Sequence, residues 1–174
     1  GYRNFCNQLW NASSFILLQC NENKISKDTS KARADLWILS EFNKTLKEYC
    51  MHLESYRFDL ATKVIYEFVW DIYCDWYIEF CKTRLQDKNL TERDKGLILN
   101  SLVTSLESIL GVLHPIIPFI TEEIWQQTKK YHNFNKKSIS QRDFPKIIKS
   151  KKSFKEIEII KSTVSGIRNF RAEM

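Results

Sequence analysis

Glycine and proline are scarce in this sequence, which has four glycines and three prolines among its 174 residues. Tight turns, hairpins and β-bulges depend on these two residue types, so their scarcity argues against an all-β sandwich or barrel. No apolar run approaches the roughly 20 residues of a membrane-spanning helix, and the charged N-terminal stretch differs from a signal peptide. The composition therefore favours long helices with few connections, and we expect no membrane partner.

Cysteine pairs with metal-site or redox spacing are also missing, because none of the five cysteines forms a Cys-x-x-Cys motif. An odd number of cysteines in a helical chain indicates buried thiols in a reducing compartment rather than a disulfide framework. We therefore expect a cytoplasmic protein without zinc. The expected thiols are Cys6, Cys20, Cys50, Cys74 and Cys81.

The formal net charge of +6 is unevenly distributed. Residues 129–174 hold 13 Lys/Arg and four Asp/Glu, whereas residues 1–128 hold 14 Lys/Arg and 17 Asp/Glu. A near-neutral helical body followed by a basic tail fits a polyanionic partner such as RNA. The same charge run also fits a solvated tail with no partner, and charge alone leaves both interpretations open.

Apolar residues recur at helical spacing over most of the chain. Ser30 and Thr91 are predicted N-caps, and Pro118 is predicted to begin a helix. Residues 131–149 lack the pattern and are expected to be irregular. Five or six helices with short links predict an all-α, up-and-down bundle. The expected helices cover residues 2–20, 32–56, 57–85, 92–113, 118–130 and 153–170.

The first two helices have predicted core faces. At about 100° per residue, Phe5, Leu9, Ala12 and Ile16 share one face of the first helix. The predicted buried stripe of the second helix consists of Leu36, Leu39, Phe42, Leu46, Tyr49 and Leu53.

The opposite face of the first helix is polar. Arginine can meet phosphates, asparagine amides can pair with base edges, and tryptophan can stack on an unstacked base. This face therefore predicts RNA contact, although an ordinary solvated face would have the same composition. Its residues are Arg3, Asn4, Asn7, Gln8 and Asn11, with Trp10 at the edge.

Residues that could carry catalysis do not form a recognisable set. Carboxylates recur at every fourth position from Glu67 to Glu79, but a di-metal bundle site also needs a Glu-x-x-His pair, which this sequence lacks. This row must face solvent or be answered by Lys or Arg from a neighbour. No two glycines are close enough for a phosphate-binding loop, and His114 is expected to hydrogen-bond at a helix end. We therefore expect no catalytic, cofactor-binding or metal-binding residue.

Several motifs resemble the anticodon-binding domain of the valyl-tRNA synthetases. A Glu-Phe-x-Trp motif followed by Cys-Asp-Trp-Tyr is similar to the valyl branch, whereas the His-Pro-Ile-Ile-Pro motif is shared with related synthetases. The residues that carry the resemblance are Gly1–Asn11, Asp35–Ser40, Tyr56–Asp59, Tyr66–Asp71, Cys74–Glu79, Leu113–Trp125 and Ile167–Met174. Two features depart from the family: Gln8 stands where a lysine is common, and residues 21–31 have no counterpart.

The resemblance implies a helical bundle of the class I aminoacyl-tRNA synthetase type that binds the anticodon stem-loop. The parent enzyme would activate valine with ATP and charge its tRNA in the cytoplasm as a monomer. The catalytic motifs would lie elsewhere in the parent chain, so we expect residues 1–174 to be non-catalytic and to hold no cofactor. Residues 1–150 would form the anticodon-binding bundle, and 151–174 a basic helix leading into a truncated C-terminal subdomain.

The predicted RNA-binding residues are Arg3, Asn4, Asn7, Trp10, Asn11, Arg168 and Arg171. The predicted partners are a valine-accepting tRNA and the rest of the synthetase chain. Two alternatives stay open at this point. One is the anticodon-binding domain of an isoleucyl- or leucyl-type synthetase, and the other is a helical protein–protein adaptor with no role in RNA binding.

Overall fold

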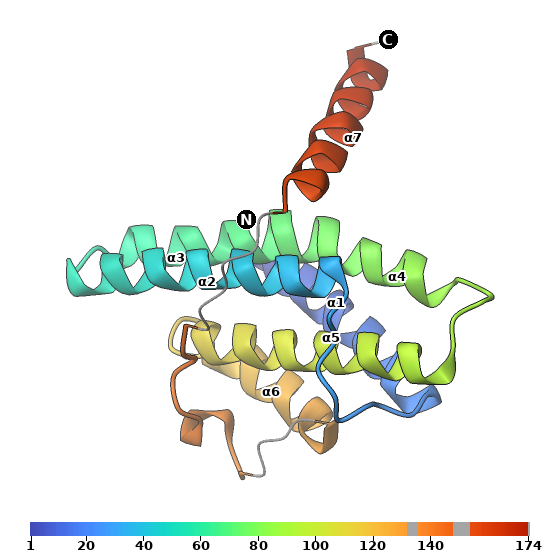
Figure 1. Ribbon diagram of the computed structural model, residues 1–174. Coiled ribbons are helices and arrows are strands. Elements are labelled where there is room, and N and C mark those ends of the chain that lie inside the picture. The colour runs from blue at the N-terminus through green and yellow to red at the C-terminus, as the bar shows by residue number, and fades with distance from the viewer. Residues whose placement is uncertain (132–135, 148–153, 174) are drawn as a thin grey trace.

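The computed structural model describes residues 1–131, 136–147 and 154–173, and these form an all-α bundle in which consecutive helices run up and down (Figure 1). The fold class predicted from the sequence is therefore confirmed. One layer holds α2 beside the long rod made by α3, η1 and α4, and the other holds α5 and α6 (Figure 1). The elements are α1 (Tyr2–Glu22), α2 (Arg33–Glu54), α3 (Phe58–Glu67), η1 (Phe68–Ile78), α4 (Glu79–Leu85), α5 (Glu92–Leu113), α6 (Pro118–Thr128), η2 (Lys129–Tyr131), η3 (Ile139–Gln141) and α7 (Lys155–Glu173).

Helix α1 joins the two layers because it contacts η1, α5 and α6. Its predicted core face is confirmed, since Phe5, Leu9, Ala12 and Ile16 are all buried. The Phe5 ring stacks on Tyr66 of α3 with ring centroids 4.0 Å apart. Burial of one face fixes the rotation of α1, so its opposite face must point to solvent.

The rod from Phe58 to Leu85 was expected as one helix, and it is continuous, but its centre is π-helical. The π segment η1 contains the aromatic cluster that fills the bundle. Tyr73 and Tyr77 are completely buried there, and the Tyr73 hydroxyl donates to the Leu102 carbonyl of α5. Nothing in the local sequence pattern distinguishes these residues from an ordinary α-helix, since the difference lies in backbone hydrogen bonding.

Helix α2 is rotated from its predicted orientation. Leu36, Leu39 and Leu53 are only half-buried, whereas Trp37 and Ile38 are in the core. The predicted stripe is therefore wrong at three of its six positions and correct at Phe42, Leu46 and Tyr49.

The cause of this rotation is a buried polar network around Asp35. The Arg84 guanidinium donates to both Asp35 carboxylate oxygens at 2.8 and 2.9 Å, and the Tyr77 hydroxyl donates to one of them at 2.8 Å. Ser30 was predicted to cap α2, which is wrong: its hydroxyl instead donates to the Asp35 carboxylate at 2.5 Å, and Ala32 is the N-cap. A buried carboxylate needs such partners because burying an unpaired charge is very costly.

The polar segment between α1 and α2 is fixed to α5. The Ser26 amide donates to the Gly96 carbonyl at 3.1 Å, and the Asn100 side chain donates to the Asp28 carbonyl at 2.9 Å. A Cβ at position 96 would lie 2.9 Å from the Lys24 carbonyl oxygen. This close approach explains a glycine inside a helix, where it is otherwise unfavourable.

Helix α5 is the main element of the layer that it forms with α6. Its predicted cap is confirmed, because the Thr91 side chain accepts from the Asp94 amide. The expectation that no apolar stretch approaches the length of a membrane span is wrong here, because α5 is the one helix of the described ranges that is long and apolar enough to cross a membrane. Within this bundle, 56% of its apolar window is buried. Its buried residues form one broad face, whereas Thr104 on the opposite side is exposed, which is typical of a helix packed against the core of a globular domain.

The segment after α6 returns to the bundle. Glu122 accepts from the Ser138 hydroxyl at 2.9 Å and from the Ile139 amide at 3.2 Å. Burial raises the pKa of Glu122, but the hydrogen bonds from Gln126, Ser138 and Ile139 outweigh it and hold this pKa below its ordinary value. Most of residues 136–147 is irregular as predicted, with η3 as one short turn, while residues 132–135 and 148–153 lie outside the described ranges.

Gly96→Ala is expected to destabilise the protein by about 1 kcal/mol or more, because overpacking against backbone outweighs the gain in helix propensity. Gly166→Ala is the matched control, since no atom lies within 4 Å of its Cβ position in α7. That substitution is expected to be neutral or to stabilise by up to about 1 kcal/mol. Urea unfolding of both variants checks the pair, and equal effects would contradict the docked loop.

Asp35→Ala is expected to destabilise the protein by about 2–3 kcal/mol, because it leaves the Arg84 guanidinium buried without its partner. This loss of unfolding free energy is at the low end for a broken buried ion pair, since 27% of the Arg84 side chain is exposed to solvent. Lys63→Ala, which breaks the exposed pair with Glu67, is the control and should cost less than about 1 kcal/mol. Chemical denaturation measures both, and a loss at Asp35 no larger than the control would refute the structural role of this network.

Candidate nucleic-acid interface

The polar face of α1 points to solvent along its whole length. Its exposed side chains are Arg3, Asn4, Asn7, Trp10 and Asn11. In the described part of the chain, neither Arg3 nor any of these three asparagines has a side-chain hydrogen bond or ion pair. Four side chains with hydrogen-bonding capacity are therefore free to bind a ligand.

This polar face has two different edges. Asn4 and Asn11 are seven residues apart and lie on the edge toward η1, where Gln8 donates to the Asp75 carboxylate at 3.3 Å. Arg3 and Trp10 are also seven residues apart and lie on the edge toward α6. Trp10 lines a narrow crevice there with Ile124, Gln127 and Thr128 among the α6 residues.

The edge toward η1 is acidic. Glu67, Asp71, Asp75 and Glu79 are all exposed, as the sequence predicted for this row. Lys63 and Lys82 answer the two end carboxylates, at 3.7 and 2.7 Å. Burial, followed by the nearby charges of Asp75 and Glu67, raises the pKa of Asp71. Phosphates are repelled by this edge, whereas base amino groups are attracted to it.

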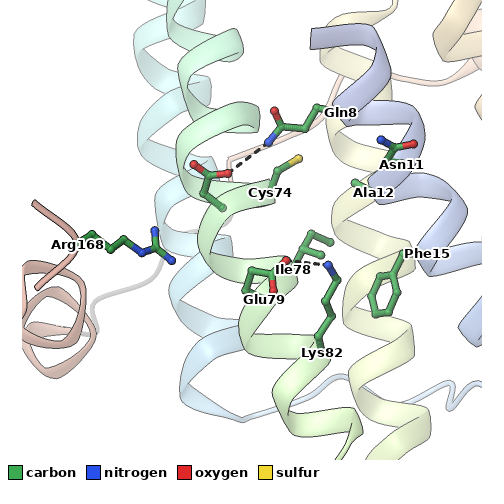
Figure 2. Close-up of a pocket in the computed structure, with 10 residues that line it drawn as sticks. Gln8, Asn11, Ala12, Phe15, Cys74, Ile78, Glu79, Lys82 and Arg168 are labelled. Carbon is green, nitrogen blue, oxygen red and sulfur yellow. Dashed lines mark hydrogen bonds and ion pairs between the residues drawn. The ribbon is translucent and has the colours of Figure 1, made fainter. Parts of the chain in front are cut away.

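A groove of about 390 Å³ lies between α1 and the rod, and two residues that the sequence predicted independently line it from opposite sides (Figure 2). Asn11 lines it from α1, and Arg168 reaches toward it from α7. Sequence reasoning missed its other polar lining residues, Asp75, Glu79 and Lys82, because they belong to the acidic row and its partner on a different helix.

Helix α7 stands away from the bundle (Figure 1), and it contacts the bundle through the buried Ile157 near its start and through charged side chains that meet tryptophan rings. The Trp37 indole donates to Glu158 at 3.3 Å, and the Lys161 ammonium lies 5.3 Å from the Trp37 ring centroid. The Arg168 guanidinium lies 5.3 Å from the centroid of Trp76. Arg168 is therefore already stacked, whereas Arg171 is exposed with no such contact in the described chain. The predicted residues thus form two groups, one on α1 and one on α7.

Gln8 stands where the resemblance described above implies a lysine. Its amide donates to Asp75, so this side chain is engaged inside the protein and does not add to the cationic surface. The same carboxylate would accept from a lysine at this position, which explains how either residue type fits here.

Burial determines the protonation of three of the five thiols. Burial raises the pKa of the Cys20, Cys74 and Cys81 thiols to about 12, which leaves them protonated and poorly nucleophilic. Cys6 and Cys50 are half-buried, so the expectation of buried thiols holds for three of five. The His114 ring lies 2.9 Å from the Thr121 hydroxyl near the start of α6, which confirms its predicted role at a helix end. Over residues 1–131, 136–147 and 154–173, no cluster of three metal-ligating side chains occurs.

Comparison with known proteins agrees with an RNA-binding interpretation. The chain belongs to the family described as the anticodon-binding domain of tRNA ligases, whose model matches residues 35–174. Over its whole length it is similar to part of a valine–tRNA ligase from Francisella tularensis subsp. tularensis, with 41% identity over 177 residues.

Valine–tRNA ligases of two other bacteria also match the whole chain. That of Buchnera aphidicola is 42% identical and that of Legionella pneumophila (strain Lens) 41% identical, each over 180 residues. The chain spans about a fifth of the length of these relatives, 19% for the first two and 20% for the third. Helix α1 lies outside the range of the family model but inside the range shared with the ligases.

Proposed function

We propose that this chain binds the anticodon stem-loop of a valine-accepting tRNA as the anticodon-binding domain of a valine–tRNA ligase. The observation that carries the proposal is the face of α1, where Arg3 and three asparagines have no side-chain partner among the described residues while the opposite face is buried in the core. Membership of the anticodon-binding family and the identity to valine–tRNA ligases support the same conclusion. They also argue against a protein adaptor and favour the valyl over the isoleucyl and leucyl alternatives.

The charge around α1 supports one orientation of the RNA. Exposed carboxylates of η1 flank the Asn4 and Asn11 edge, so phosphates are expected on the opposite edge, with Arg3. The bases would then lie over the asparagine amides, whose donors and acceptors match base edges. Trp10 would stack on an unstacked base.

The parent enzyme would activate valine with ATP and transfer it to tRNA in the cytoplasm, as a monomer. Residues 1–174 would contribute no catalytic group, and would act by adding binding energy at the anticodon that helps position the distant acceptor end. In the same proposal, residues 1–150 are the binding bundle and 151–174 lead into the following subdomain. Arg168 and Arg171 would contact the tRNA backbone.

Asn7→Ala is expected to leave the free energy of unfolding within about 0.5 kcal/mol of wild type, because the side chain is exposed and unpaired. It should reduce discrimination between a valine anticodon and one altered at its middle adenine. Losing a bidentate amide–adenine contact costs roughly 1–3 kcal/mol in the comparable DNA case. Stem-loop affinities and melting temperatures measure the two effects separately.

Arg3→Ala is the contrasting variant, since loss of a phosphate contact should weaken binding to all stem-loops alike. An unchanged affinity ratio for the two anticodons in Asn7→Ala would remove Asn7 from the recognition surface. Lost stability with intact selectivity would instead assign it a packing role.

The double variant Arg168→Ala/Arg171→Ala is expected to lower the salt dependence of tRNA binding by about one unit of slope per charge removed. Lys88→Ala, in the exposed loop before α5, removes one positive charge away from α7. This control should leave the salt dependence of wild-type binding unchanged. Because Arg168 also packs on Trp76, Arg171→Ala alone tests the backbone contact without disturbing α7. Identical slopes in wild type and both α7 variants would dismiss this role.

A further inference from the structure

The turn between α2 and α3 has a backbone conformation that its sequence does not favour. Tyr56 has a φ of 56°, and it is the only non-glycine residue with positive φ in the described ranges. The Arg57 amide donates to the His52 carbonyl at 2.8 Å, and the Tyr56 amide donates to the Leu53 carbonyl at 3.0 Å. This pair of bonds is the Schellman arrangement that ends a helix.

Glycine is the usual residue at the left-handed position of this arrangement, because a Cβ there is unfavourable. A tyrosine in its place is a local source of strain for the isolated turn. Internal packing does not explain the choice, since 82% of the Tyr56 side chain is exposed. The ring is therefore available for a contact outside the described residues.

Two more apolar side chains close to Tyr56 in the sequence are also exposed. Phe58 is 61% exposed and Met51 is 53% exposed, both within a few residues of Tyr56. The nearby cation is neutralised, because Arg57 makes a bidentate pair with Asp59 at 3.0 and 2.9 Å. We call Met51, Tyr56 and Phe58 the hairpin tip.

Charge decides which kind of partner fits the hairpin tip. Residues 47–63 hold three Lys/Arg and three Asp/Glu, so this end of the bundle has no excess of positive charge to attract a phosphate backbone. Neutral surfaces with exposed aromatic rings and methionine are typical of the centres of protein–protein interfaces. Figure 1 shows the turn between α2 and α3 at one end of this hairpin and the start of α2 at the other, and Asp35 lies in the first turn of α2.

We propose that the hairpin tip docks against another domain of the same synthetase polypeptide, with the Tyr56 and Phe58 rings buried in the contact. This inference rests on the proposed function, because it requires the bundle to be one domain of a longer ligase. The relatives are about five times as long as this chain, so most of such a polypeptide is available as the partner. Docking also gives a physical reason to keep tyrosine where glycine would relieve strain.

The sign of a single substitution tests the docking in the complete ligase. Tyr56→Gly is expected to lower its unfolding temperature, because the buried ring is lost. If the ring faces solvent, glycine relieves the left-handed strain and raises the unfolding temperature by about 2–4 °C for a domain of this size. Asparagine tolerates the left-handed conformation, so Tyr56→Asn should change the unfolding temperature in the same direction as Tyr56→Gly. Tyr56→Phe keeps the ring and should have the unfolding temperature of wild type. A rise or no change in Tyr56→Gly overturns the proposal.

A photo-crosslinking amino acid, benzoylphenylalanine, at position 56 of the complete ligase identifies the partner. We expect an adduct within the same polypeptide, to a peptide outside these 174 residues. The same probe at position 88, in the exposed loop at the other end of the rod, should give none. An adduct to bound tRNA, or no adduct at all, overturns the docking.

The outcome is distinguishable from failure of the proposed function. Tyr56→Gly is expected to keep the wild-type affinity for an anticodon stem-loop, because the tip is separate from the polar face of α1. If the wild-type ligase does not bind the stem-loop, the RNA proposal is overturned. The crosslink at position 56 still decides whether the hairpin tip docks within the polypeptide.

Discussion

The buried pair between Asp35 and Arg84 joins α2 to α4 through a network of charged and polar groups. Its carboxylate receives hydrogen bonds from α4, from Tyr77 of η1 and from Ser30 in the segment before α2. Removing either charge leaves the other in the interior, so the network can only form as a whole. It therefore sets the rotation of α2 against the rod, and with it the tryptophan surface on which α7 rests.

The division between what the sequence predicted and what it did not follows the range of the interactions. The core face of α1 and the Thr91 cap depend on residues within one or two turns, and both were predicted correctly. The face of α2 depends on Arg84, 49 residues away from Asp35, and a local pattern of leucines could not reveal it. Ser30 was misread for the same reason, since a serine before a helix is usually a cap.

Of two other features, one had a weak signal in the sequence and the other had none. A lone glycine within the α5 pattern, Gly96, marked the close approach of the loop from α1, but it did not identify what approached. The left-handed turn at Tyr56 had no signal, because tyrosine is not a residue associated with that conformation. In the candidate site, helical periodicity predicted the exposed residues of α1. The groove shared with α7 needed the tertiary structure, since Asn11 and Arg168 are far apart in sequence.

The stacking of Arg168 on Trp76 has a consequence for how α7 could meet an anion. The Arg168 guanidinium lies over the Trp76 ring, 5.3 Å from its centroid, and a cation–π contact of this kind restrains the side chain. A side chain held in this way has lost much of its rotational freedom before any ligand arrives. The conformational entropy of this long side chain is therefore lost when the protein folds, and it no longer reduces the free energy of binding. Trp76 thus acts as a template that preorganises a cation at the protein surface.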